Sequence, residues 1–306
     1  MNSLIRELSA GGISACENLP LSKHSSFRIG GNADLAVFPT DEEQLIRSVM
    51  LCRERKTPYC VIGNASNVLF PDDGIRGAVI FTGRMRGLTP LPDGFCADCG
   101  VPLAALANAA MEASLTGCEF AQGIPGTVGG AVVMNAGAYG GELAQIVRET
   151  AFFDCRTGAR CTVSGEAHRF GYRRSVFSDD PDRVILSARI MLAPGKREEI
   201  SERMRTFAAC RREKQPLSCP SAGSVFRRPE GHFAGKLIED CGLKGRSVGG
   251  AEVSTVHAGF IVNRGGATAR DVRELIAIIR RTVEENTGVR LECEIRFAED
   301  LIRTAE

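Results

Sequence analysis

The sequence predicts an α+β protein in which helices and strands alternate without a regular repeat. Residues 147–192 carry apolar runs separated by polar turns, a pattern typical of strands. Residues 269–286 carry one apolar stripe at helical spacing. Neither the P-loop glycine pattern nor a G-x-G-x-x-G after a strand occurs. A dinucleotide-binding Rossmann crevice therefore has no support.

Length and composition indicate a soluble globular chain of two or three domains. It has 306 residues, of which 43% are hydrophobic and 25% charged. The net charge of +1 favours neither nucleic acid nor a membrane surface as a partner. Tryptophan is absent and there are three tyrosines, so few of these side chains are available to stack on nucleic-acid bases. We expect small-molecule partners and no obligate protein partner.

The twelve cysteines predict reduced, mostly buried thiols rather than disulfides or a metal site. Cys96 and Cys99 form the one close pair, and no second pair matches it. The first eight residues include an acidic side chain and no apolar core, unlike a signal peptide. No run reaches eighteen apolar residues. The expected location is the cytoplasm.

The first third of the chain predicts short strands between two helices. Thr40 and Glu43 form a capping-box pattern at the start of a helix over 40–56. Pro102 suits the first turn of a second helix that ends near residue 113. Strands are expected at residues 59–62, 68–70 and 77–81.

The last third predicts two helices and a final strand. A Pro-Gly pair precedes a charged, solvated helix over 196–214, and this break is the expected domain boundary. Thr268 and Asp271 cap the helix over 269–286, and Gly288 ends it. Alternating charged and apolar residues predict a strand over 289–297.

Two glycine-bearing segments point to a bound anion or flat ligand. Residues 123–141 hold seven glycines, one proline and no charge, and most of the others are Val, Ile, Ala or Met. Such composition favours backbone buried close against another chain segment or a cofactor. Residues 63–67 lie between two apolar strands, where backbone N–H groups converge on an anion. A plain polar turn is the alternative for this second loop.

Three other segments carry reactive side chains in unusual company. Apolar residues surround Arg173 and Arg174, which predicts partial burial and an anionic partner. Ser224 lies between glycine and an apolar pair, without the context of a hydrolase elbow. Glu292, Glu294 and Arg296 would share one face of the final strand. The alternatives are a solvated surface pair for the two arginines, a turn or capping role for Ser224, and a half-exposed edge strand for the segment with Glu292 and Glu294.

Taken together, these segments resemble the UDP-N-acetylenolpyruvoylglucosamine reductase (UDP-N-acetylmuramate dehydrogenase) family, flavoenzymes of peptidoglycan precursor synthesis. The matching segments are long, specific and in the family's order. They are residues 24–31, 63–70, 123–142, 170–177, 214–216, 221–226, 234–245, 253–263 and 291–297.

The resemblance implies a FAD-binding fold of the vanillyl-alcohol-oxidase (PCMH) type, followed by a C-terminal α+β substrate-binding domain. It implies one FAD-binding subdomain from residues 1–75 with 289–306 and a second from 76–197. The substrate-binding domain would span 198–288. It also implies FAD and NADPH as cofactors and no metal. The implied cofactor-binding residues are Gly63, Asn64, Ala65, Ser66, Asn67, Gly123, Ile124, Gly126, Thr127, Gly129, Gly130 and Ala131.

The implied reaction is hydride transfer from NADPH to flavin and then to C3 of an enolpyruvyl group, with protonation at C2. Ser224 matches the family's proton donor, and Arg173 matches the arginine that holds the substrate carboxylate. Glu294 matches the acid that stabilises the enolate-like intermediate, which requires a raised pKa if it acts near neutral pH. Lys214 matches a lysine on the substrate's phosphates, and Tyr172 is a further expected substrate contact.

The chain departs from the family pattern in three places. Ala65 stands where glycine is frequent, so a positive φ there would strain the loop. Arg228 stands where asparagine is usual. Only 51 positions separate Arg173 from Ser224, so the chain resembles the shorter form without the tyrosine-bearing insertion. Two other functions stay open: another FAD-dependent oxidase of the same cofactor fold, or a nucleotide-binding regulatory module without turnover.

Overall fold

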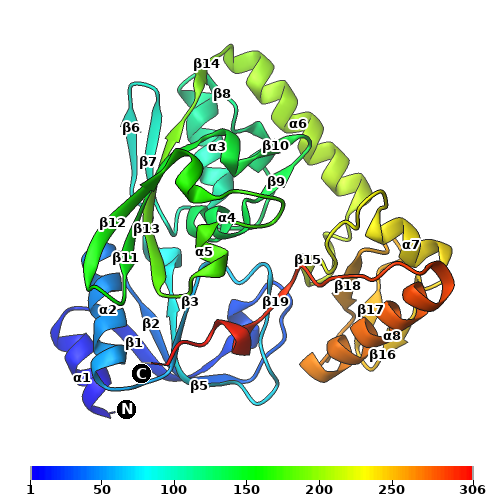
Figure 1. The fold of residues 1–306 in the computed structure, drawn as a ribbon, viewed down its shortest axis with the longest axis horizontal. Coiled ribbons are helices and arrows are strands. Elements are labelled where there is room, and N and C mark those ends of the chain that lie inside the picture. Colours follow the sequence, from blue (N-terminus) through cyan, green and yellow to red (C-terminus); the bar gives the residue numbers. More distant parts are fainter. Residues whose placement is uncertain (1, 305–306) are drawn as a thin grey trace.

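The computed structural model describes residues 2–304, and its helices and strands gather around three sheets of four or five strands each (Figure 1). The first and second sheets lie together on one side of the view, and the third lies apart on the other side. The long helix α6 (Arg197–Lys214) runs from the second sheet towards the third. The predicted α+β class is confirmed.

The first sheet has the order β1-β2-β5-β3, in which β1 runs antiparallel to β2 and the other pairs are parallel. The predicted helix over 40–56 is α2, but its N-cap is Asp41 rather than Thr40. The Asp41 carboxylate accepts the Gln44 backbone N–H at 2.9 Å, and a carboxylate caps better than a threonine hydroxyl. The elements are α1 (Asn2–Ala10), β1 (Ser14–Pro20), β2 (Asn32–Phe38), α2 (Glu42–Glu54), β3 (Tyr59–Ile62), β4 (Val68–Leu69) and β5 (Ile75–Phe81).

The second sheet is fully antiparallel, with the order β12-β11-β13-β7-β6. It confirms the strands predicted within 147–192. Pro102 is the N-cap of α3, with extended backbone, rather than a first-turn residue. The elements are β6 (Leu88–Leu91), β7 (Gly94–Asp98), α3 (Leu103–Glu112), β8 (Leu115–Thr116), α4 (Val128–Met134), β9 (Gly137–Ala138), β10 (Gly141–Glu142), β11 (Val147–Asp154), β12 (Ala159–Ser164), α5 (Val176–Asp179), β13 (Arg183–Met191) and β14 (Ala193–Pro194).

The third sheet, β15-β18-β17-β16, is antiparallel and packs against α8. The predicted cap of α8 is confirmed, because Thr268 and Asp271 form a capping box and Gly288 ends the helix at φ 72°. Its predicted apolar stripe is buried. The elements are β15 (Ser221–Ser224), α7 (Ala234–Asp240), β16 (Ser247–Val248), β17 (Ala251–Val253), β18 (Phe260–Asn263) and α8 (Ala269–Thr287).

After α8 the chain returns to the first sheet, shown in red in Figure 1. The strand predicted over 289–297 is wrong for most of its length. Only β19 (Arg296–Phe297) is a strand, and it pairs in parallel with β4. The domain boundaries given above stay a prediction, and residues 1, 305 and 306 of those ranges lie outside the described residues.

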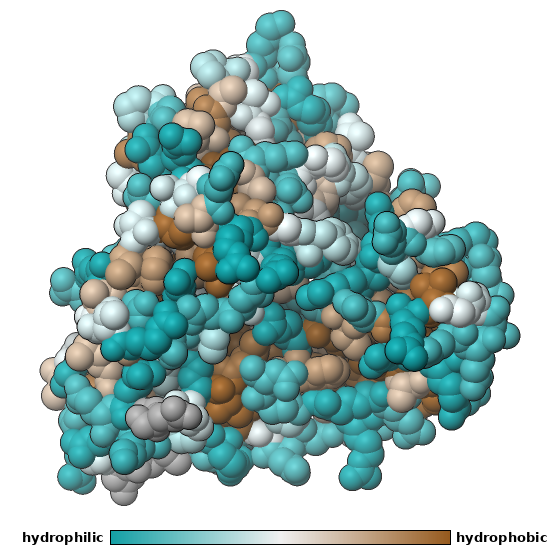
Figure 2. All heavy atoms as spheres, viewed as in Figure 1, coloured by the Kyte–Doolittle hydropathy of each residue, from teal (hydrophilic) through white to brown (hydrophobic). Residues whose placement is uncertain are grey.

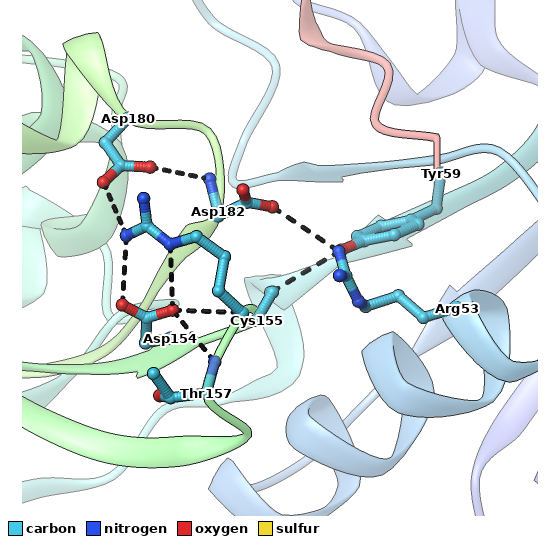
Figure 3. Close-up of polar contacts among 8 residues, drawn as sticks. Arg53, Tyr59, Asp154, Cys155, Thr157, Asp180 and Asp182 are labelled. Atoms are coloured by element: carbon cyan, nitrogen blue, oxygen red, sulfur yellow. Dashed lines mark hydrogen bonds and ion pairs between the residues drawn. The ribbon is translucent and has the colours of Figure 1, made fainter. Parts of the chain in front are cut away.

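A polar junction joins the first sheet to the second (Figure 3). The Tyr59 hydroxyl lies 3.6 Å from the Cys155 sulfur, and an Arg53 guanidinium nitrogen lies 3.5 Å from an Asp182 oxygen. Arg156 hydrogen-bonds Asp154 and lowers the pKa of that carboxyl to about 2. These contacts tie α2 and β3 to the ends of β11 and β13.

Five of the twelve cysteines are buried and seven are partly buried, fewer buried thiols than the composition predicts. Burial raises the pKa of Cys52, Cys60, Cys99 and Cys118 to about 12. These thiols therefore stay protonated and pack as small apolar side chains. Within residues 2–304, no helix has the length and apolar character that crossing a membrane requires.

Candidate active site

A cavity of about 950 Å³ is lined by residues from the regions of the first, second and third sheets. In Figure 2 hydrophilic side chains cover most of the visible face, and hydrophobic side chains show in patches between the first and third sheets. Every site residue predicted from the sequence lines this cavity. They are Gly63, Asn64, Ala65, Ser66, Asn67, Gly123, Ile124, Gly126, Thr127, Gly129, Gly130, Ala131, Tyr172, Arg173, Lys214, Ser224 and Glu294.

The loop after β3 is held against the glycine-rich segment. The Asn64 amide donates to the Pro125 carbonyl at 2.7 Å. A Cβ at Gly63 would lie 2.3 Å from the Thr127 hydroxyl oxygen, so glycine is required there. Ala65 is buried and has φ 46°. This is the left-handed conformation that was predicted to strain an alanine at this position. The loop thus keeps a turn that glycine would adopt more easily.

The glycine-rich segment packs against another chain segment and also lines the cavity, and its role in binding a cofactor stays a prediction. At Gly129, in α4, a Cβ would lie 2.8 Å from the Cys99 Cβ, so the backbone packs against another chain segment. Gly130 is exposed and faces the cavity. The Thr127 hydroxyl is buried without a hydrogen-bond partner among the described residues. An unpartnered buried hydroxyl at a cavity wall fits a ligand that accepts or donates a hydrogen bond.

Arg173 and Glu294 form a partly buried ion pair at the cavity, although 121 positions separate them. The Arg173 Nε donates to a Glu294 carboxylate oxygen at 2.7 Å. Their side chains are 22% and 15% exposed. Burial raises the pKa of Glu294, and the Arg173 charge offsets that only in part. Arg173 has φ 55°, a strained conformation that holds its side chain towards the cavity.

The neighbouring Arg174 has a different role. It pairs with Asp179 at 2.7 Å, and its side chain is more than half exposed. Of the two arginines, only Arg173 lines the cavity. The predicted partial burial therefore applies to Arg173, and the solvated alternative applies to Arg174.

Ser224 ends β15 and lies beside the segment that carries Glu294. Its hydroxyl donates to the Phe226 carbonyl at 3.3 Å. The Glu294 N–H donates to the Val225 carbonyl at 2.7 Å, so the two segments run side by side. The prediction that Glu292 shares a face with Glu294 is wrong, since the Glu292 side chain is 74% exposed and pairs with Arg227.

Hydrogen bonds from Asn67, in the first-sheet loop, and from Ser26, in a separate N-terminal segment, reach these two segments. The Asn67 amide donates to the Glu294 carbonyl at 3.1 Å, and the Arg296 N–H donates to the Asn67 carbonyl at 2.9 Å. The Ser26 hydroxyl donates to the Ser221 carbonyl at 2.8 Å. Asn67 therefore links the predicted cofactor loop to the segment of Glu294, and Ser26 links the start of β15 to the N-terminal part of the chain.

Tyr172 and Lys214 lie at the rim of the cavity and are exposed. The Tyr172 hydroxyl accepts the Arg228 backbone N–H at 3.1 Å. The Arg228 guanidinium lies 4.4 Å from the centre of the Phe233 ring. The residue that departs from the family pattern thus lies at the cavity entrance, next to an expected substrate contact.

Sequence reasoning missed Arg211 and His257, which also line the cavity. His257 belongs to a matched segment, but no role was attached to it. Arg211 lies on the helix that was interpreted as solvated, three residues before Lys214. Helical spacing places these two residues on one face of α6 and would have identified Arg211.

Comparison with known proteins identifies the family. Residues 215–298 match the model for the C-terminal domain of UDP-N-acetylenolpyruvoylglucosamine reductase. The chain is 47% identical to the UDP-N-acetylenolpyruvoylglucosamine reductase of Syntrophomonas wolfei over 280 residues, which cover 91% of this chain and 93% of that one. The chain belongs to the UDP-N-acetylenolpyruvoylglucosamine reductase family.

Other relatives and a solved structure agree with this family membership. The reductase of Clostridium perfringens is 45% identical over 278 residues, covering 91% of each chain. The crystal structure of the Thermus caldophilus reductase superposes with a TM-score of 0.78 at 35% identity, covering 93% of this chain and 98% of that one. Residues 33–164 match a FAD binding domain, which confirms the predicted FAD-binding fold.

Proposed function

We propose that this chain reduces the enolpyruvyl group of UDP-N-acetylglucosamine-enolpyruvate to give UDP-N-acetylmuramate, with FAD bound and NADPH as reductant. Family membership supports the reaction. The meeting of Arg173, Ser224 and Glu294 at one cavity is the observation that carries it. The proposed setting is peptidoglycan precursor synthesis in the cytoplasm, with no obligate protein partner.

The cavity walls fit a flavin nucleotide. The loop at residues 63–67 and the segment from Gly123 to Ala131 would hold its diphosphate and one face of its ring. The unpartnered Thr127 hydroxyl and the backbone at Gly63 and Gly130 support this assignment, because they offer polar groups without side-chain bulk. When bound, FAD supplies the hydride that adds to C3 of the enolpyruvyl group.

Arg173 would bind the substrate carboxylate. Glu294 occupies its Nε, and one terminal nitrogen makes a long contact of 3.4 Å with the Gly137 carbonyl. The remaining donors of the guanidinium are free to form a two-point contact with a carboxylate. Negative charge that develops at C2 spreads into this carboxylate, so a fixed cation beside it stabilises the transition state.

Ser224 would donate the proton to C2. A serine hydroxyl is a weak acid, so it protonates only a strongly basic atom, and a carbanion next to a carboxylate is one. Glu294 would donate a hydrogen bond to the enolate-like group. Its raised pKa supports this role, because a carboxyl group donates only while it keeps its proton.

Lys214 and Tyr172 would contact the nucleotide end of the substrate from the cavity rim. A lysine ammonium suits a diphosphate that remains partly solvated. The hydrogen bond from the Arg228 backbone fixes the Tyr172 hydroxyl in place. These two residues would therefore affect substrate affinity more than the chemical step.

The proposal is tested by separating the two half-reactions in wild type and Ser224→Ala. We expect flavin reduction by NADPH to survive in the variant, while reoxidation by the enolpyruvyl sugar falls by about 10²–10⁴-fold. Stopped-flow absorbance under anaerobic conditions measures both. Equal loss of both half-reactions would contradict the role of Ser224. Wild type that is reoxidised by oxygen and not by the sugar would instead identify an oxidase.

A further inference from the structure

Arg211 is a buried cation without a counter-charge. The residue is 8% exposed, and its Nε has no hydrogen-bond partner in the part of the chain that the structure describes. Within residues 2–304 no carboxylate forms an ion pair with it. Burying an unpaired charge costs free energy, so a side chain kept in this state indicates a missing anion.

The surroundings of Arg211 direct it into the cavity. A Cβ at Gly123 would lie 2.9 Å from the Arg211 Cδ, and Gly123 has φ 80°. The Arg211 Cζ lies 5.4 Å from the centre of the Tyr139 ring, which stacks on Phe207 at 4.5 Å. Desolvation lowers the pKa of Arg211, and no carboxylate opposes that effect. The glycine-rich segment carries no charge of its own.

Arg203 on the same helix shows how this chain treats an arginine with a purely structural role. Its guanidinium bonds the buried Glu119 at 2.7 Å. Arg203 lies two turns earlier on α6 and does not line the cavity. Among the described residues, α6 thus has a carboxylate partner at Arg203, away from the cavity, and none at Arg211, at the cavity wall.

We propose that Arg211 binds a phosphate group of a nucleoside diphosphate seated in the cavity. Its planar guanidinium would form charge-assisted, two-point hydrogen bonds with phosphate oxygens. Lys214, one turn further along α6, adds a second positive charge at the same wall. This inference rests on the proposed function, in which both FAD and the sugar nucleotide carry such a diphosphate.

The test compares Arg211→Met and Arg211→Lys with Arg212→Met as a matched control. Arg212 is exposed on the same helical turn and does not line the cavity. Titration calorimetry of the oxidised holoenzyme with UDP gives the affinity for the substrate's diphosphate. The rate at which free flavin fluorescence appears after dilution gives the retention of FAD. Neither measurement requires turnover.

We expect Arg211→Met to weaken UDP binding or speed FAD release by about tenfold or more. The measurement that changes identifies which diphosphate Arg211 binds. Arg211→Lys should lie between wild type and Arg211→Met, and Arg212→Met should stay within about twofold of wild type. Because an uncompensated charge is removed, the thermal midpoint of Arg211→Met without UDP should not fall below that of Arg212→Met.

Unchanged UDP affinity and unchanged FAD release in Arg211→Met would overturn the inference. So would a lower thermal midpoint with both ligands bound normally, because that result describes a structural residue. Wild type that binds UDP and FAD but does not reduce the enolpyruvyl sugar would contradict the proposed function alone. Wild type that binds neither nucleotide would contradict both.

Discussion

Two carboxylates in this molecule, one buried and one partly buried, pair with arginine, and their pKa values move in opposite directions. Glu119 pairs with Arg203 beside α6, and Glu294 pairs with Arg173 at the cavity. Both contacts measure 2.7 Å, and the two carboxylate side chains are 8% and 15% exposed. The pKa of Glu119 is lowered, whereas that of Glu294 is raised.

The difference lies in the number of hydrogen bonds to each carboxylate. Burial alone would raise both pKa values. At Glu119 the Thr116 hydroxyl, the Arg203 guanidinium and the Gly117 N–H more than offset burial. Within residues 2–304 the Glu294 carboxylate receives one hydrogen bond, from Arg173, and the effect of burial on its pKa prevails. A carboxylate that is fully bonded is structural, while one that keeps a free oxygen at a cavity can do chemistry.

The largest expected effect is at the arginine of the cavity pair. Arg173→Met removes the cation that the substrate carboxylate would bind, so reoxidation of the reduced enzyme by the enolpyruvyl sugar should fall by about 10²–10³-fold. It also leaves Glu294 without its one donor, so the pKa of Glu294 should rise further. Stopped-flow reoxidation checks the rate. Arg174→Met, at the exposed neighbouring pair, is the control and should react like wild type.

Next in size is the effect of Glu294→Gln. The glutamine keeps a hydrogen-bond donor but cannot titrate, so we expect sugar reduction to slow by about tenfold to 10²-fold. The rate should also lose the limb that falls as pH rises through the raised pKa of Glu294. A pH profile of the reoxidation rate measures this. An unchanged limb in Glu294→Gln would contradict the role of Glu294 as an acid.

Glu119→Gln should affect stability rather than chemistry. The lowered pKa of Glu119 means that its contribution is present above the ordinary glutamate pKa and is lost as pH falls through the lowered value. We expect the variant to lose roughly 1–2 kcal/mol of unfolding free energy at pH 7. Urea unfolding of both proteins measures it. The difference should vanish in acid, and turnover at pH 7 should match wild type.

The smallest expected effect is at the strained alanine of the first-sheet loop. Ala65→Gly relieves a φ of 46° but increases the freedom of the unfolded chain. Relief of the backbone strain outweighs the added entropy of the unfolded chain, which leaves a gain of about 0.5 kcal/mol in unfolding free energy. Urea unfolding checks this as well. A loss of stability would show that the loop does not strain alanine.

Local signals predicted the elements that depend on local chemistry. The capping box at Thr268 and the apolar stripe of α8 lie within one segment, so the sequence contains the whole argument. The same reasoning misplaced the cap of α2 by one residue, because Asp41 competes with Thr40. The strand over 289–297 was wrong because alternation cannot supply a partner: Arg296–Phe297 pairs with β4, while Cys293 makes an isolated bridge to Phe226 that does not extend into a strand.

The site was predictable in its members and not in its contacts. The resemblance assigned Arg173, Ser224 and Glu294, but nothing local joins two residues 121 positions apart. The burial of Arg211 was not predicted because the charged composition of α6 indicates a solvated helix. Which face of the helix is buried depends on the cavity wall that it packs against. The opposite shifts of Glu119 and Glu294 also depend on donors that folding brings together.

The direct test of this comparison is a titration of the two carboxyl groups by NMR on protein labelled with ¹³C at the glutamate side chain. Glu119→Gln and Glu294→Gln assign the two signals. We predict that Glu294 titrates above the ordinary glutamate pKa and Glu119 below it. A Glu294 that titrates at or below the ordinary value, or below Glu119, would contradict the account of this site.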